Sequence, residues 1–90
     1  MRTVYERFYL DICDLDGTHR ETRHLDCGLE KAKEAASRAS IYGNALVSLH
    51  SNVENNPLDS WAAGSHFSRY ENALDYARGR AAKAESHVAR

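Results

Sequence analysis

The stretch VYERFYLDICDLDGTHRETRHLDC, residues 4–27, decides the fold of this 90-residue chain. Up to Cys13 it alternates between apolar and polar side chains, which is the period-two pattern of a strand with one buried face. Asp16-Gly17 supplies residues that accept the positive φ of a tight turn, and residues 19–25 return as a polar strand. We therefore predict an antiparallel hairpin whose second arm is an edge strand protected by its charges.

The alternation gives the first arm two faces. The apolar face, which we assign to the core, consists of Val4, Phe8, Leu10 and Ile12. The other face carries Tyr5, Arg7, Tyr9 and Asp11. Tyrosines beside charged side chains are typical of protein interfaces, so this second face is a candidate binding surface.

Two amphipathic helices are predicted after the hairpin. Asp26 is placed to cap a helix over residues 27–42, which Gly43 ends in the left-handed conformation. A closing helix over residues 68–84 begins with the capping box Ser68-Arg69-Tyr70-Glu71. Its apolar stripe consists of Tyr70, Ala73, Leu74, Ala77, Ala81, Ala84 and Val88.

Two further strands complete the expected fold. One covers residues 44–51, and a weaker one covers residues 59–67 around Trp61, with Gly64 as a bend or bulge. We therefore predict a single α+β domain over residues 1–90, of element order ββαββα, with four antiparallel strands and both helices on one face of the sheet. The two halves, residues 4–42 and 44–88, share this order, which suggests an internal duplication.

One segment of the hairpin, Ile12-Cys13-Asp14-Leu15-Asp16-Gly17-Thr18, resembles the Asp-x-Asp-Gly-Thr signature of haloacid-dehalogenase-like phosphotransferases. The resemblance implies Asp14 as nucleophile, Asp16 as acid/base and a magnesium ion beside the substrate phosphate. That family requires a doubly wound parallel sheet, for which 90 residues are too few. We therefore interpret the segment as a tight turn, and keep magnesium-dependent phosphoryl transfer through Asp14 and Asp16 as an alternative.

A second resemblance concerns the closing helix. Arg69-Tyr70-Glu71-Asn72-Ala73, with Arg80 further along, is similar to the closing helix of small phage-encoded anti-CRISPR proteins. The resemblance implies a protein of phage or a mobile element that binds a protein complex of the bacterial host, such as a CRISPR surveillance complex. We accordingly expect a non-enzymatic protein-binding module in the host cytoplasm.

The overall charge is small, with a formal net charge of −1. It gives no general attraction to nucleic acid or to an anionic membrane, so nucleic acid is not the favoured partner. Nucleic-acid binding through basic residues of the last helix, Arg78 and Arg80 among them, is nevertheless kept as an alternative. A homodimer is also considered, because a domain of this size buries only about two-thirds of its unfolded surface and is therefore marginally stable alone.

No catalytic residue, metal or cofactor is predicted. Cys13 and Cys27 fall at different places along the expected hairpin, which favours reduced thiols, and their spacing fits no common zinc site. The five histidines are spread along the chain without an activating motif. The residues that we predict to bind a partner are Tyr5, Arg7, Tyr9, Asp11, Asp14, Asp16, Arg78 and Arg80.

Overall fold

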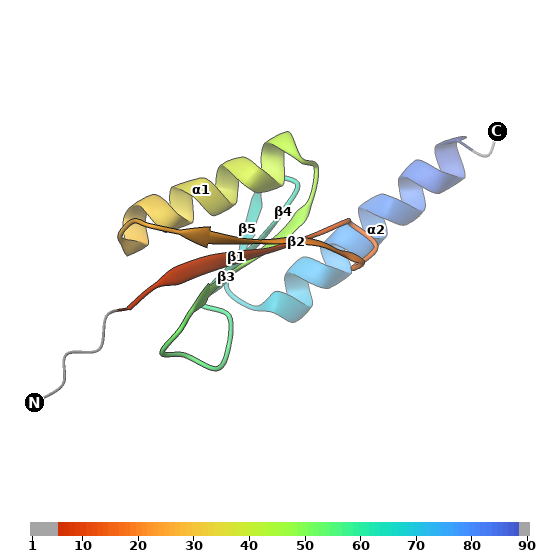
Figure 1. Cartoon of the computed structure of the whole chain (residues 1–90). Helices are drawn as coiled ribbons and strands as arrows, with labels where there is room; N and C mark the ends of the chain where they lie inside the picture. The colour runs from red at the N-terminus through yellow and green to blue at the C-terminus, as the bar shows by residue number, and fades with distance from the viewer. Residues whose placement is uncertain (1–5, 89–90) are drawn as a thin grey trace, which may run out of the picture.

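The computed structural model describes residues 6–88, with side chains up to residue 83. The elements are β1 (Phe8–Cys13), β2 (His19–Leu25), α1 (Leu29–Tyr42), β3 (Leu46–Ser51), β4 (Asp59–Ala62), β5 (Ser65–Phe67) and α2 (Tyr70–Val88). The five strands form one antiparallel sheet in the order β2-β1-β3-β4-β5. The α+β class with two helices and an antiparallel sheet is therefore confirmed (Figure 1).

The prediction of four strands in the order ββαββα is wrong, because the segment 59–67 folds into two strands. Ala63 has φ 48° and Gly64 has φ 90°. Two consecutive residues with positive φ make a tight hairpin turn, so the chain reverses between β4 and β5 where we expected a bend in one strand. The observed order is ββαβββα.

The helices lie on opposite faces of the sheet, so the prediction that both cover one face is also wrong (Figure 1). Helix α1 packs on β1, β3 and β4, whereas α2 packs on β3, β4 and β5. The α1-side core consists of Phe8, Leu10, Ile12, Ala32, Ala36, Ala45, Val47, Leu49 and Trp61. The α2-side core consists of Cys13, Leu46, Ala62, Ala73 and Ala77.

The apolar face of β1 was predicted correctly, since Phe8 and Leu10 are buried in the α1-side core. Val4 lies outside the described residues. The hairpin is also confirmed, although β1 begins at Phe8. Gly17 has φ 98° at its turn, as expected for the glycine of the Asp16-Gly17 pair.

The ends of the helices differ from the prediction. Gly28 occupies the N-cap of α1 and no side chain caps it, so Asp26 is not the capping residue. At the other end Gly43 has φ −88°, and it is Asn44, with φ 47°, that is left-handed. Helix α2 continues to Val88, beyond the predicted end. The side chains of Ala84 and Val88 lie outside the described part of the chain.

Neither helix, over the part that the structure describes, combines the length and apolar character needed to cross a membrane.

Candidate functional site

The sheet face on the α2 side is organised in rows of side chains that cross the strands. The row that α2 covers consists of Cys13, Leu46 and Ala62, which are paired across β1, β3 and β4. The helix places Ala73 and Ala77 against this row. Both sides of this contact are built mainly from small side chains, and the partly buried Tyr70 and Leu74 of α2 pack against it.

The next row is polar and begins at the edge strand. Across the sheet it consists of Thr22, Asp11, Ser48 and Ser60. Thr22 Oγ1 donates a hydrogen bond to Asp11 Oδ1 at 3.1 Å. Ser48 and Ser60 are buried, and within the described residues the Ser60 hydroxyl has no hydrogen-bond partner. The row marks the boundary between the part of this face that α2 covers and the part that it leaves open.

The third row consists of the aromatic rings of His24, Tyr9 and His50, and we call it the ring row. The rings of Tyr9 and His50 are stacked, with centroids 5.0 Å apart and planes 8° apart. The rings of Tyr9 and His24 are tilted by 43°, with centroids 5.8 Å apart. Tyr9 and His50 are half-buried and His24 is exposed. The rings thus hold one another in place on a surface that is partly exposed in the described part of the chain.

A bulge in β2 adds a third histidine to this surface. Ile12 pairs with Glu21 but Cys13 pairs with His19, so β2 contains one extra residue, Arg20. The extra residue allows His19 and Thr22, three positions apart, to face the same side of the sheet. His19 Nε2 lies 3.1 Å from Asp11 Oδ1 and 3.1 Å from Thr22 Oγ1. Asp11 therefore lies within hydrogen-bond distance of two possible donors, the His19 ring and the Thr22 hydroxyl.

His50 is a half-buried titratable group of the ring row. Burial of the ring lowers the pKa of His50, and the nearby Asp11 carboxylate partly opposes this effect. Ser48 Oγ lies 3.0 Å from His50 Nε2, within hydrogen-bond distance. A neutral His50 is suited to stack on Tyr9, since a charged ring would have to lose water to do so.

Of the predicted site residues, the structure brings Tyr9 and Asp11 together on neighbouring rows of this face. Tyr5 lies outside the described residues. Arg7 is exposed just before β1, where its backbone N–H donates to Asn52 Oδ1 at 2.7 Å. The other predicted site residues lie at the hairpin turn or on α2.

Asp14 and Asp16 have structural partners in the hairpin turn. Arg20 donates from Nε to Asp14 Oδ1 at 2.9 Å, and its Nη2 forms an ion pair with the same oxygen. The Thr18 backbone N–H donates to Asp16 Oδ1 at 2.8 Å. Hydrogen bonds from Thr18, and to a smaller extent the charge of Arg78, lower the pKa of Asp16. Asp16 and Arg78 therefore lie close together, and the two carboxylates contribute to the turn.

Arg80 lies on α2 beside Tyr76. Its guanidinium carbon is 5.8 Å from the centroid of the Tyr76 ring, and Nη1 donates to the Tyr76 hydroxyl at 3.3 Å. Arg78, in contrast, lies near Gly17 of the hairpin turn. The two arginines thus have different neighbours within the chain and do not form one basic stripe.

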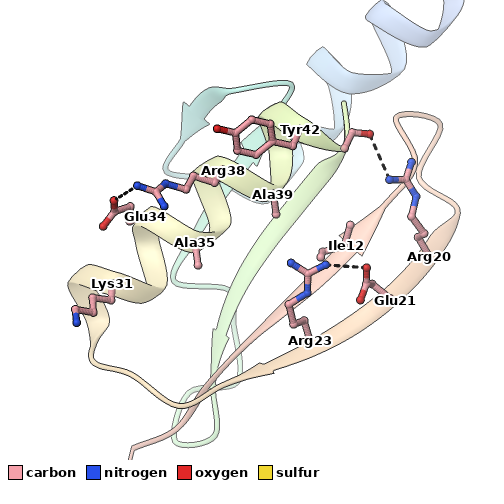
Figure 2. Close-up of a pocket in the computed structure, with 11 residues that line it drawn as sticks. Ile12, Arg20, Glu21, Arg23, Lys31, Glu34, Ala35, Arg38, Ala39 and Tyr42 are labelled. Atoms are coloured by element: carbon pink, nitrogen blue, oxygen red, sulfur yellow. Dashed lines mark hydrogen bonds and ion pairs between the residues drawn. The ribbon is translucent and has the colours of Figure 1, made fainter.

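A groove runs on the other side of the sheet, between α1 and the edge strand β2 (Figure 2). It has a volume of about 710 Å³. Its apolar residues are Ile12, Ala35 and Ala39. Its charged residues are Arg20, Glu21, Arg23, Lys31, Glu34 and Arg38, and Tyr42 stands at one end. Arg23 is paired with Glu21 at 3.0 Å and Arg38 with Glu34 at 2.7 Å.

The cysteines are free, with Cys13 buried and Cys27 half-buried. Burial raises the pKa of Cys13, and the charges of Asp11 and Asp14 raise it further. In the described part of the chain no three histidine, cysteine, aspartate or glutamate side chains are grouped so that they could hold a metal ion.

Sequence reasoning did not select the histidines that complete the ring row. Their placement depends on the register of β1 with β2 and β3, and β3 is separated from β1 by a strand and a helix. A signal was nevertheless present for His24. Counting back from the Asp16-Gly17 turn brings His24 near Tyr9 on the hairpin.

Comparison of the chain with protein-family models, with curated proteins and with solved structures finds no match.

Proposed function

We propose that this chain is a small protein-binding module without enzymatic activity, and that its partner docks on the ring row. The observation that carries the proposal is the stacking of Tyr9 on His50, with planes 8° apart, where both rings remain partly exposed in the described part of the chain. A ring that is already held in place loses little conformational freedom when a partner covers it. Tyrosine is one of the side chains enriched among the few residues that supply most of the binding free energy of a protein interface.

The polar row beside the rings supports a protein as the partner. Asp11, His19 and Thr22 offer hydrogen-bond donors and acceptors next to the aromatic surface. Protein interfaces typically combine an aromatic centre with a polar rim of this kind. A nucleic-acid interface would instead require several cations to meet phosphates, and Asp11 would repel them.

The partner that we propose is a protein complex of a bacterial host, namely a defence complex of the CRISPR-Cas type. The chain would be encoded by a phage or mobile element and would inhibit this complex in the host cytoplasm. The support for this class is the similarity of Arg69-Tyr70-Glu71-Asn72-Ala73 and Arg80 to the closing helix of small phage-encoded anti-CRISPR proteins.

The test is retention of a protein complex from a bacterial lysate by the immobilised chain. We expect the parent chain to retain one stoichiometric complex and Tyr9→Ala to lose it, because truncation of a central interface tyrosine costs more than about 2 kcal/mol of binding free energy. Tyr42→Ala is the matched control. It removes the same side chain from α1, where Tyr42 is 85% exposed, and should leave recovery unchanged.

Other outcomes would locate the function elsewhere. Loss of the complex in Tyr42→Ala alone would move the contact to the groove beside α1. Salt-sensitive recovery of nucleic acid, abolished by reversing the charges of Arg78 and Arg80, would replace the proposal with a nucleic-acid function. Tyr9→Ala removes a ring stacked on His50 and should lower the melting temperature somewhat. Circular dichroism at the temperature of the assay should show both variants folded, so that a change in recovery reports binding.

A further inference from the structure

The outer edge of β2 is open in the described part of the chain. The alternation of backbone hydrogen bonds along the strands determines which backbone groups of β2 face outward. Asn52 N–H donates to the Arg7 carbonyl at 3.0 Å, one position beyond the pair of Phe8 and Ser51. Because successive residues of a strand direct their backbone groups to opposite neighbours, the odd-numbered residues of β1 form backbone hydrogen bonds with β3 and the even-numbered residues form them with β2. Leu10 pairs with Arg23. The backbone groups of Thr22 and His24 therefore point away from the sheet.

We propose that β2 pairs in antiparallel fashion with β2 of a second copy of this chain, with the two-fold axis at Thr22. In this register each Thr22 exchanges both backbone hydrogen bonds with its copy. Glu21 of each copy lies opposite Arg23 of the other, in the closely spaced kind of pair in which side chains interact most strongly. The two sheets become one sheet of ten strands that has no open β2 edge.

We expected the charges of β2 to discourage pairing in general, but their alternation favours this one register over its neighbours. An axis at Arg23 would place two arginines opposite each other, and an axis at Glu21 would do the same with two glutamates. Like charges directly opposite each other destabilise a strand pair, whereas opposite charges stabilise it. Glu21 and Arg23 already lie on the same face of β2 and are paired at 3.0 Å.

The groove beside α1 fits the same arrangement. Glu21 and Arg23 line its β2 side, as Figure 2 shows. A second copy paired along β2 extends the sheet beneath this side and brings its own groove next to the first. On the opposite face the two ring rows come to lie on one continuous surface, so a dimer would present Tyr9 twice to a partner.

The experiment uses the charge pattern and requires no knowledge of any other partner. Glu21→Arg and Arg23→Glu each place like charges opposite each other in the two-fold pair, so we expect each variant to sediment as a monomer. An equimolar mixture restores opposite charges at both positions. We expect it to dimerise like the parent, and native mass spectrometry should identify the species as the mixed dimer.

Thr22→Pro is a second and independent variant. It removes an N–H that faces away from β1, so it should abolish the dimer while the circular dichroism spectrum stays that of the parent. The proposal is overturned if the parent sediments as a monomer even at about 1 mM. It is also overturned if either charge variant dimerises like the parent, or if the mixture stays monomeric. A monomeric parent would leave the β2 edge free for the strand of a different protein, whereas a dimer that tolerates either charge change would use another register or another surface.

Discussion

Tyr9 is held by its neighbours in the sheet and not by a hydrophobic core. Its two cross-strand partners are histidines, and its ring is stacked on His50 at a centroid distance of 5.0 Å. Leu10, the next residue, is fully buried under α1. One step along the strand therefore separates a residue needed for stability from one that we propose for binding, because neighbouring side chains in a strand point to opposite faces.

His50 should make the stability of the fold sensitive to acid. Its pKa is lowered in the folded state, so below the ordinary value of 6.5 the unfolded chain binds a proton more readily and unfolding is favoured. We expect the melting temperature of the parent to fall as the pH decreases from about 7.5 to about 5, and His50→Gln to reduce the size of this fall. His24→Gln is the control, since it changes the exposed ring on the other side of Tyr9.

Comparison of the pH dependence, and not of the melting temperature at one pH, is the informative measurement here. His50→Gln also removes a stacked ring and therefore lowers stability at every pH. If His50→Gln keeps the full acid sensitivity of the parent, the lowered pKa of His50 does not contribute, and carboxylates must account for the effect.

At the scale of elements, Ser40 joins α1 to the hairpin of β4 and β5. Its hydroxyl donates to the Ser37 carbonyl at 2.7 Å and accepts a hydrogen bond from the Gly64 backbone N–H at 3.0 Å. Ser40 is fully buried. Gly64 itself has positive φ, and a Cβ there would lie 2.9 Å from Ile41 Cγ1, so both conformation and space require glycine.

We expect Ser40→Ala to lower the free energy of unfolding by about 1–3 kcal/mol, because it leaves the Gly64 N–H without its partner. Urea denaturation measures this loss. Ser37→Ala is the matched control on the same helix, since the bond from Ser40 uses the carbonyl of Ser37 and not its side chain. Because alanine has a higher helix propensity than serine, Ser37→Ala should lose no stability. A loss in Ser40→Ala no larger than that in Ser37→Ala would mean that the link to Gly64 contributes nothing.

The elements were more predictable than their arrangement. Alternation in β1 and the Asp16-Gly17 turn are local signals, and both were interpreted correctly. The sequence of β3 also contained a local sign, which we overlooked, that both faces of the sheet are covered. Residues 45–49 are buried on both parities, and Leu46 between Ala45 and Val47 is the pattern of a strand covered on two sides. The turn at Ala63-Gly64 lacked such a signal, because alanine rarely adopts positive φ.

At the scale of the whole molecule, the two faces of the sheet are stabilised unequally. The α1-side core contains Leu10, Leu49 and Trp61, whereas the α2-side core is built largely from alanines. The α2-side core has fewer fully buried residues than the α1-side core, so we expect α2 to be held by less free energy than α1. Local opening of α2 should therefore occur more often than unfolding of the whole domain.

Cys13 provides a direct probe of this opening, because it is buried in the α2-side core with Ala73 and Ala77. Its raised pKa further slows its reaction in the closed state. In native protein we expect a thiol reagent to modify the half-buried Cys27 first and Cys13 later, at a rate set by α2 opening. Mass spectrometry of the digested protein separates the two sites.

Glycine substitutions in the two helices distinguish local opening from global unfolding. Ala77→Gly weakens α2 by about 1 kcal/mol and should raise the rate of Cys13 modification about fivefold. Ala36→Gly weakens α1 by a similar amount, and both alanines are fully buried. It should leave that rate nearly unchanged, because α2 can open while α1 stays packed on the other face. If both variants accelerate the modification equally, Cys13 is exposed only by global unfolding, and the two faces of the sheet form one cooperative unit.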